Sequence, residues 1–160
     1  MLSIFNNLKP FFEDVYREIS VREYARMQDI SPPTASKLLN QFAKEELLIK
    51  KQDRIYLMFR ANKTSDFFKD LTKAFWRKRL TKVLEPLREE LMFKPITLFG
   101  SLFKVENTIN SDVDLFIDLP EKKIDLSKAE KLLKREIQLF FKNAAKSEEL
   151  IKNIKKGLII

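Results

Sequence analysis

The sequence contains neither cysteine nor histidine, and only two of its 160 residues are glycine. Without these side chains the chain has no disulfide, no zinc site of the usual ligands, and no thiol or Ser-His-Asp nucleophile. Any metal ion would be held by oxygen atoms, which favours magnesium or manganese. No run of 18 apolar residues and no signal-peptide pattern after Met1 are found, so we expect a cytoplasmic protein without a membrane partner.

The composition is that of an ordinary globular protein, with 44% hydrophobic and 34% charged residues. A length of 160 residues suits one large domain or two small ones. The formal net charge is +8, which suits a polyanionic partner such as nucleic acid. A basic excess also serves solubility alone, so charge by itself leaves both interpretations open.

Three helices are expected in the first part of the chain, over Lys9–Arg17, Val21–Met27 and Pro32 to about Glu46. Ser31 followed by Pro32 is a strong helix start, because the hydroxyl caps free N–H groups and proline fits the first helical position. We expect the buried faces to contain Phe11, Phe12, Val15, Tyr16, Tyr24, Ala25, Met27, Ala35, Leu38, Leu39 and Phe42.

A pair of strands is expected next, over Leu47–Lys51 and Arg54–Arg60, with Ile55, Leu57 and Phe59 pointing inward. Helices followed by such a hairpin resemble a winged helix-turn-helix domain, whose second helix enters the major groove of double-stranded DNA. The residues expected to contact DNA are the polar face of that helix and the basic hairpin: Thr34, Ser36, Lys37, Asn40, Gln41, Lys44, Lys51 and Arg54. The alternative is that these side chains only solvate an ordinary helix face.

A connecting segment, residues 64–94, follows the polar junction after the hairpin. Ser65 and Asp66 are typical of a helix start, and Pro86 predicts a break near Glu85. A basic cluster beside Trp76 is interpreted as the solvent-exposed face of this helix rather than as a nucleic-acid site. The cluster consists of Arg77, Lys78, Arg79 and Lys82.

The motif with the most chemical content lies in the second half of the chain. The apolar strand Ile96–Phe99 ends at Gly100 and Ser101, and Ser111-Asp112-Val113-Asp114 follows after a spacer. Glycine permits close approach of the backbone, and a helix turn beginning at Ser101 offers N–H groups to a phosphate. The strand period places Asp112 and Asp114 on one face, where the two carboxylates repel each other unless a divalent cation lies between them.

These residues resemble the minimal nucleotidyltransferases of the DNA polymerase beta superfamily, whose pattern is Gly-Ser, a spacer and Ser-Asp-x-Asp. The resemblance implies that Gly100 and Ser101 bind the phosphates of a nucleoside triphosphate. It implies that Asp112 and Asp114 are catalytic and hold magnesium. Several family members carry a small residue, an arginine and a glycine where this chain has Phe103, Lys104 and Val105.

The family places a third carboxylate on the strand expected at Ile137–Phe141, and the aligned residue here is Gln138. An amide carries no charge, so the site has one negative charge fewer to balance the positive charge of the metal ions. Glu136, on the same strand face, is a hypothetical replacement metal ligand.

The predicted fold is α+β: a winged helix-turn-helix over residues 1–63, connecting helices over 64–94, and a small nucleotidyltransferase domain with a mixed sheet over 95–160. This order resembles archaeal-type proteins in which a winged helix precedes a nucleotidyltransferase domain. One hypothesis is an enzyme that transfers a nucleoside monophosphate, from ATP or another triphosphate, to a protein or small acceptor. Small relatives of this kind include antitoxins that adenylylate a toxin. The alternative is a non-catalytic transcriptional regulator whose degenerate nucleotidyltransferase domain only senses nucleotide or mediates assembly. Under either hypothesis the protein could be a homodimer, because winged helices often dimerise on paired DNA half-sites.

Overall fold

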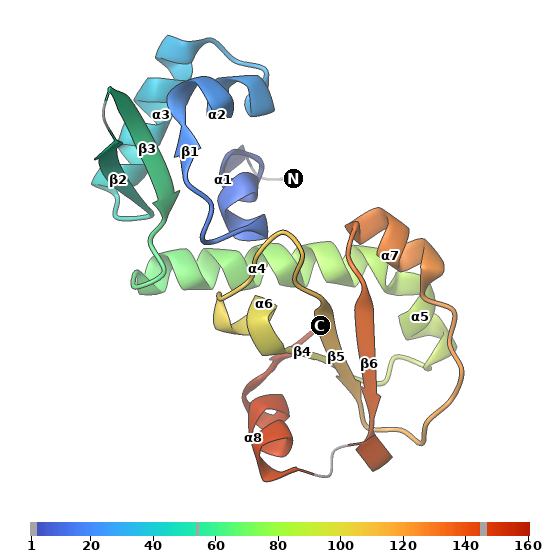
Figure 1. Cartoon of the computed structure of the whole chain (residues 1–160). Helices are drawn as coiled ribbons and strands as arrows, with labels where there is room; N and C mark the ends of the chain where they lie inside the picture. Colours follow the sequence, from blue (N-terminus) through green and yellow to red (C-terminus); the bar gives the residue numbers. More distant parts are fainter. Residues whose placement is uncertain (1–2, 54, 145–146) are drawn as a thin grey trace. The chain divides into compact units, whose positions relative to one another are not determined.

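The computed structural model describes residues 3–53, 55–144 and 147–160, and it forms two compact units. The first unit ends at Thr72 and the second runs from Lys73 to Ile160, so the division falls inside helix α4. In chain order (Figure 1) the elements are α1 (Ser3–Glu13), β1 (Ile19–Ser20), α2 (Val21–Gln28), α3 (Pro32–Lys44), β2 (Leu48–Asp53), β3 (Tyr56–Ala61), α4 (Asp66–Val83), α5 (Glu85–Glu90), β4 (Ile96–Phe99), α6 (Gly100–Lys104), β5 (Val113–Ile117), α7 (Ser127–Leu133), β6 (Ile137–Phe141), the 3-10 turn η1 (Lys142–Ala144), α8 (Glu148–Lys156) and β7 (Leu158–Ile159).

The first unit combines helices with an antiparallel sheet of strand order β1-β3-β2. Helix α2 packs on α3, and α3 packs on β2. Tyr24 of α2 is fully buried, and its hydroxyl donates a hydrogen bond to the carbonyl of Asn7 in α1 at 2.9 Å. Burial raises the pKa of Tyr24 far above its ordinary value. Phe12 of α1 contacts Phe68 at the start of α4, with ring centroids 5.4 Å apart.

Helix α1 begins earlier than the predicted Lys9 and ends earlier than the predicted Arg17. Phe5 and Leu8 share the buried face with Phe12, so tertiary packing extends the helix toward the N-terminus. Asp14 ends the helix region, because its Oδ1 accepts the backbone N–H groups of Tyr16 and Arg17 at 3.1 Å each. Tyr16, predicted to be buried, is therefore 48% exposed.

Three further expectations about the first unit are wrong. Met27 is 43% exposed, because Tyr24 and Ala25 fill the core face of α2. Ile55 is 81% exposed, since it lies beyond Asp53 and Tyr56, the last paired residues of the hairpin. Leu38 is only half-buried. The short strand β1 has no counterpart among the predicted elements; it pairs with the middle of β3.

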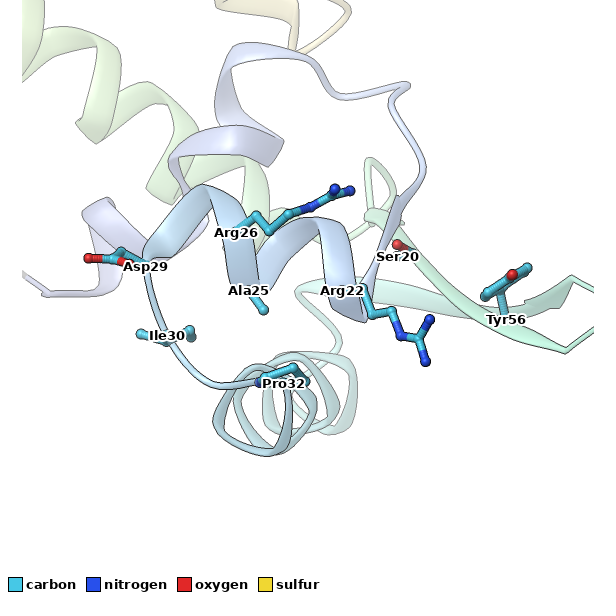
Figure 2. Close-up of a pocket in the computed structure, with 8 residues that line it drawn as sticks. All are labelled: Ser20, Arg22, Ala25, Arg26, Asp29, Ile30, Pro32 and Tyr56. Carbon is cyan, nitrogen blue, oxygen red and sulfur yellow. The ribbon is translucent and has the colours of Figure 1, made fainter.

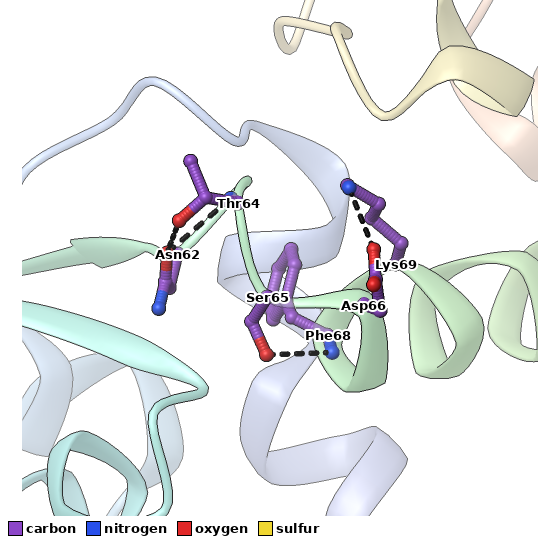
Figure 3. A network of polar contacts seen from close by, with 6 residues as sticks. All are labelled: Asn62, Thr64, Ser65, Asp66, Phe68 and Lys69. Carbon is purple, nitrogen blue, oxygen red and sulfur yellow. Dashed lines mark hydrogen bonds and ion pairs between the residues drawn. The ribbon is translucent and has the colours of Figure 1, made fainter.

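The start of α4 follows the sequence signals closely (Figure 3). The Ser65 hydroxyl accepts the N–H of Phe68 at 3.4 Å, and Lys69 forms an ion pair with Asp66 at 2.9 Å. Before the helix, the Asn62 side chain accepts the Thr64 hydroxyl at 2.7 Å. Helix α4 ends at Val83 and α5 begins at Glu85, as Pro86 predicts.

The second unit is built on a mixed sheet, as the sequence predicts, and its strand order is β6-β5-β4-β7. Strands β5 and β6 are parallel, whereas β4 is antiparallel to both β5 and β7. Three of the four residues of β4 and alternate residues of β5 are buried, and α4, α5 and Leu84 between them contribute further buried side chains. These core residues include Ile96, Leu98, Leu115, Ile117, Phe75, Trp76, Leu80, Leu84 and Leu87. Of the described helices, none has the length and apolar character needed to cross a membrane.

Gly157, between α8 and β7, has no room for a side chain. A Cβ there would lie 2.5 Å from Thr97 Cγ2 and 2.7 Å from the carbonyl oxygen of Leu98. We expect Gly157→Ala to lower the free energy of unfolding by about 1–3 kcal/mol, measured by urea denaturation. Adding Thr97→Ser removes the nearer clash and should restore part of that stability, whereas native stability of Gly157→Ala alone would contradict the prediction.

Candidate functional site

Gly100 connects β4 to α6 and lies against a carboxylate. Its φ is +70°, a conformation that glycine adopts without strain. A Cβ at this position would lie 1.9 Å from Oδ2 of Asp114. The approach follows from strand register, because Phe99, the last residue of β4, pairs with Asp114 of β5. Both the backbone angle and the contact therefore require glycine here.

The short helix α6 presents Ser101 directly after this contact. Ser101 is half-buried, and no side chain caps the N-terminus of the helix. The helix ends at Lys104, and the next residue, Val105, has a left-handed φ of 59° and a buried side chain. A β-branched residue rarely adopts this conformation. The loop therefore makes a left-handed turn at a valine.

Asp114 is the second residue of β5, Asp112 directly precedes the strand, and both side chains are half-buried. Burial and, secondarily, the neighbouring Asp112 carboxylate raise the pKa of Asp114 above its ordinary value. Gln138 of β6 pairs with Asp114 in the parallel register. Its side-chain Nε2 donates a hydrogen bond to Oδ2 of Asp112 at 2.6 Å. The structure thus brings Gln138 into the site as a hydrogen-bond donor.

Two further acidic residues of the second unit, Asp118 and Glu136, are exposed. Asp118 is exposed and forms an ion pair with Lys142 at 3.3 Å. Glu136 is exposed, and its backbone carbonyl accepts the N–H of Val113. In the described part of the chain, no group of three or more Asp or Glu residues is placed to hold a metal ion, so Glu136 does not form such a group with Asp112 and Asp114. Its role as a ligand stays a prediction.

The donor set at Asp112 and Asp114 fits a hard divalent cation. Burial of Asp114 first, and the neighbouring Asp112 carboxylate second, raise the pKa of Asp114 and so disfavour its ionised form. A cation between them would remove this cost, and oxygen ligands are those that magnesium and manganese prefer. An oxygen from the Gln138 amide could join only if the amide rotates, because its nitrogen faces Asp112.

Arg135 also lies near this site, although no sequence signal predicts it there. Its side chain is buried and binds backbone carbonyls of the turn that precedes Asp112. Trp76 is fully buried, although the sequence places it beside a solvent-exposed basic cluster. The Arg135 guanidinium lies over its ring. A single arginine before an apolar strand has no distinguishing pattern, so only the structure reveals the contact.

The predicted DNA-contacting residues of α3 fall into two groups. Thr34, Lys37, Gln41 and Lys44 are exposed and follow one another at helical spacing along one face. Ser36 and Asn40 are half-buried on a neighbouring face. The Asn40 amide nitrogen donates to the carbonyl of Ser36 at 2.8 Å, and its oxygen accepts Lys50 Nζ of β2 at 2.8 Å. Asn40 therefore links α3 to the hairpin.

The hairpin residues of the prediction are partly described. Lys51 is exposed, with its Nζ 3.7 Å from a carboxylate oxygen of Glu18. Arg54 lies outside the described residues. A hollow of about 600 Å³ opens beside these elements, between α2, the turn before α3 and the hairpin (Figure 2). The side chain of Arg22 extends toward Tyr56 on its wall. Neither residue is among those predicted, although Arg22 follows the Ser20 cap at the start of α2, which is a usable signal.

Comparison with known families gives a match to the second half of the chain. A family model described as a nucleotidyltransferase domain matches residues 80–160, just over half of the chain. The match includes Gly100, Ser101, Asp112 and Asp114. No curated protein matches the sequence.

Removing the charge of Asp114 is expected to stabilise the metal-free protein. The folded state raises the pKa of this carboxyl above its ordinary 3.8, so its contribution to stability is fully present below pH 3.8 and is lost as the pH rises through the folded pKa. In chelator-containing buffer, Asp114→Asn should therefore have a higher Tm than the native chain at neutral pH, and the difference should vanish in acid.

The matched control for this prediction is Asp118→Asn, which removes the same charge from an exposed, ion-paired carboxylate. This variant should gain no stability between acid and neutral pH. Calorimetric melting curves over that range measure both variants. If the Tm of the two variants changed with pH in the same way, ionised Asp114 would not destabilise the folded protein more than an exposed carboxylate does.

Proposed function

The chain belongs to the nucleotidyltransferase domain family, and we propose that its second unit binds a nucleoside triphosphate, ATP by preference, together with magnesium. Gly100 and Ser101 would bind the phosphates, while Asp112 and Asp114 would be the catalytic carboxylates that hold the cation. The observation that carries the proposal is the contact of Asp114 with Gly100, which joins the two halves of the motif in one place.

The proposed reaction is nucleotidyl transfer. The oxygen of an acceptor hydroxyl forms a bond to the α-phosphorus as the bond from that phosphorus to the pyrophosphate oxygen breaks, and the hydroxyl proton is released to solvent. A divalent cation, when bound, would compensate the negative charge that gathers on the phosphate oxygens. The chain contributes position: α6 would direct backbone N–H groups toward the phosphates, and the β4–β5 register fixes Asp114 beside them.

Gln138 favours a second candidate, a regulator whose nucleotidyltransferase domain no longer turns over substrate. The position expected to carry a third carboxylate holds an amide that donates to Asp112. This hydrogen bond gives one Asp112 oxygen a partner without adding another negative charge. A site that holds no metal ion needs such a neutral donor. Retention of Asp112 and Asp114 supports the enzyme, because a scaffold has no need of two repelling carboxylates.

Nucleotide binding tests the enzyme candidate, because a chain that binds no triphosphate cannot transfer its nucleoside monophosphate. We expect ribonucleoside triphosphates, ATP above all, to bind the native chain in the presence of magnesium and to bind much more weakly in chelator. The double variant Asp112→Asn with Asp114→Asn should lose the magnesium-dependent binding of nucleoside triphosphate, because it lacks the charges that hold the cation. Isothermal titration calorimetry measures both. Absence of binding to the native chain would leave only the regulator.

Two single variants define the metal ligands in the same experiment. Gln138→Asp should tighten magnesium-dependent binding on the order of tenfold, since it supplies the missing charge. Glu136→Gln should weaken binding if Glu136 is a ligand and leave it unchanged if it is not. Asp118→Asn serves as the control, because that carboxylate is paired with Lys142.

For the first unit we propose a winged helix-turn-helix that binds double-stranded DNA. The order of α2, α3 and the β2–β3 hairpin supports this, as does the exposed face of α3 with its two lysines. Arg22 and Tyr56 would extend the contact surface beside the hairpin. Since Asn40 is bonded to Ser36 and Lys50, we assign base contacts to Gln41 and phosphate contacts to the lysines.

Together the two activities suit an antitoxin-like protein that modifies a protein acceptor, such as a toxin, and binds DNA as a dimer on paired half-sites. This assignment of acceptor and assembly follows from the resemblance and from the two proposed sites. Copurification with a neighbouring gene product, followed by mass spectrometry for an added nucleoside monophosphate, tests the acceptor directly.

DNA binding is tested by charge removal on α3. We expect Lys37→Ala with Lys44→Ala to weaken binding to a mixed-sequence duplex, and to reduce the slope of log affinity against log salt by about 0.9 for each phosphate that is no longer neutralised. Fluorescence anisotropy over a range of salt concentrations measures both. Lys152→Ala with Lys155→Ala in α8 is the matched control, because it removes the same charge from exposed positions of the second unit. An equal effect of both pairs would indicate attraction by net charge alone.

A further inference from the structure

We propose that Arg135 is a positioning residue that fixes Asp112 beside Asp114 by holding the turn Thr108–Ser111. The inference rests on the proposed function in taking Asp112 as a cation-holding carboxylate. Arg135 would act through the backbone that carries Asp112, by hydrogen bonds to carbonyl groups of that turn.

The turn is closed by its own hydrogen bonds. The backbone N–H of Ser111 donates to the carbonyl of Thr108 at 3.2 Å, and the Ser111 hydroxyl accepts the N–H of Thr108 at 2.9 Å. Arg135 adds bonds from outside the turn: its Nη1 donates to the carbonyl of Thr108 at 2.9 Å and to the carbonyl of Ser111. That second carbonyl belongs to the peptide that joins Ser111 to Asp112.

The guanidinium is itself held in place. Arg135 is only 7% exposed, and its Cζ lies 5.3 Å from the centre of the Trp76 ring, which is fully buried in α4. A buried cation requires polar partners, and those of Arg135 include carbonyl oxygens and an aromatic face. Arg135 directly precedes Glu136, whose carbonyl accepts the N–H of Val113. One short segment therefore fixes the chain on both sides of Asp112.

Gln138 provides a readout of where Asp112 lies. Because its Nε2 donates to Asp112 Oδ2, the side-chain amide resonances of Gln138 report this bond by NMR in metal-free protein. The reference for a broken bond is Asp112→Ala. We expect Arg135→Met to shift the Gln138 side-chain resonances toward the reference position. Arg79→Met should leave them unchanged, since Arg79 also lies over the Trp76 ring but donates to the carbonyl of Leu133.

A folded Arg135→Met variant with native Gln138 resonances would overturn the proposal. If that variant fails to fold, Arg135→Lys is used, since it keeps the charge and a shorter donor. We then expect a partial shift, and no shift would again overturn the proposal. Circular dichroism identifies which variants are folded.

The functional consequence is measured with Mn²⁺ as the probe. If the native chain binds Mn²⁺, we expect Arg135→Met to raise the dissociation constant about tenfold to a hundredfold, and Arg79→Met to leave it unchanged. An unchanged constant in Arg135→Met would refute the role in cation binding. If the native chain binds no Mn²⁺ the proposed function fails, whereas the NMR comparison still decides whether Arg135 positions Asp112.

Discussion

The contact between Gly100 and the Asp114 carboxylate is the constraint on which the candidate site depends. It exists because β4 and β5 are paired in a register that places the end of one strand opposite Asp114 of the other. A carboxylate that rests on the backbone of a glycine leaves no space for any other residue. The turn proposed to bind phosphate and the Asp114 carboxylate are therefore brought together by the same strand register.

Holding the two carboxylates together costs free energy, and the fold sustains this cost through its backbone. The raised pKa of Asp114 reflects burial first and the charge of Asp112 second. Sheet pairing fixes Asp114, whereas Asp112 lies just before β5 and depends on the turn and on the hydrogen bond from Gln138. A site in which the ionised form of a carboxyl group is disfavoured in this way is typical of functional sites, where a bound cation or a reacting group offsets the negative charge.

Much of the second unit could be predicted because its signals are local. An apolar run that stops at a rare glycine, a pair of aspartates at strand spacing, and Pro86 each act within a few residues, and the strands, the helix break and the mixed sheet are confirmed. What the sequence could not show depends on contacts between distant segments. The start of α1 is set by core packing of Phe5 and Leu8, and the contacts of Arg135 join the turn before Asp112 to α4.

The same distinction applies to the candidate DNA surface. Spacing along α3 identifies which residues share a face, but it could not show that the Asn40 amide is already bonded to Ser36 and Lys50. An amide whose nitrogen and oxygen both have partners would have to give them up before it could recognise a base, and that exchange reduces the gain from each new hydrogen bond. Gln41 is exposed, and its amide nitrogen is bonded on the surface to the nearby Glu45, so it would give up less. Sequence recognition would thus shift from Asn40 to Gln41, while Asn40 keeps α3 and the hairpin in a fixed relation.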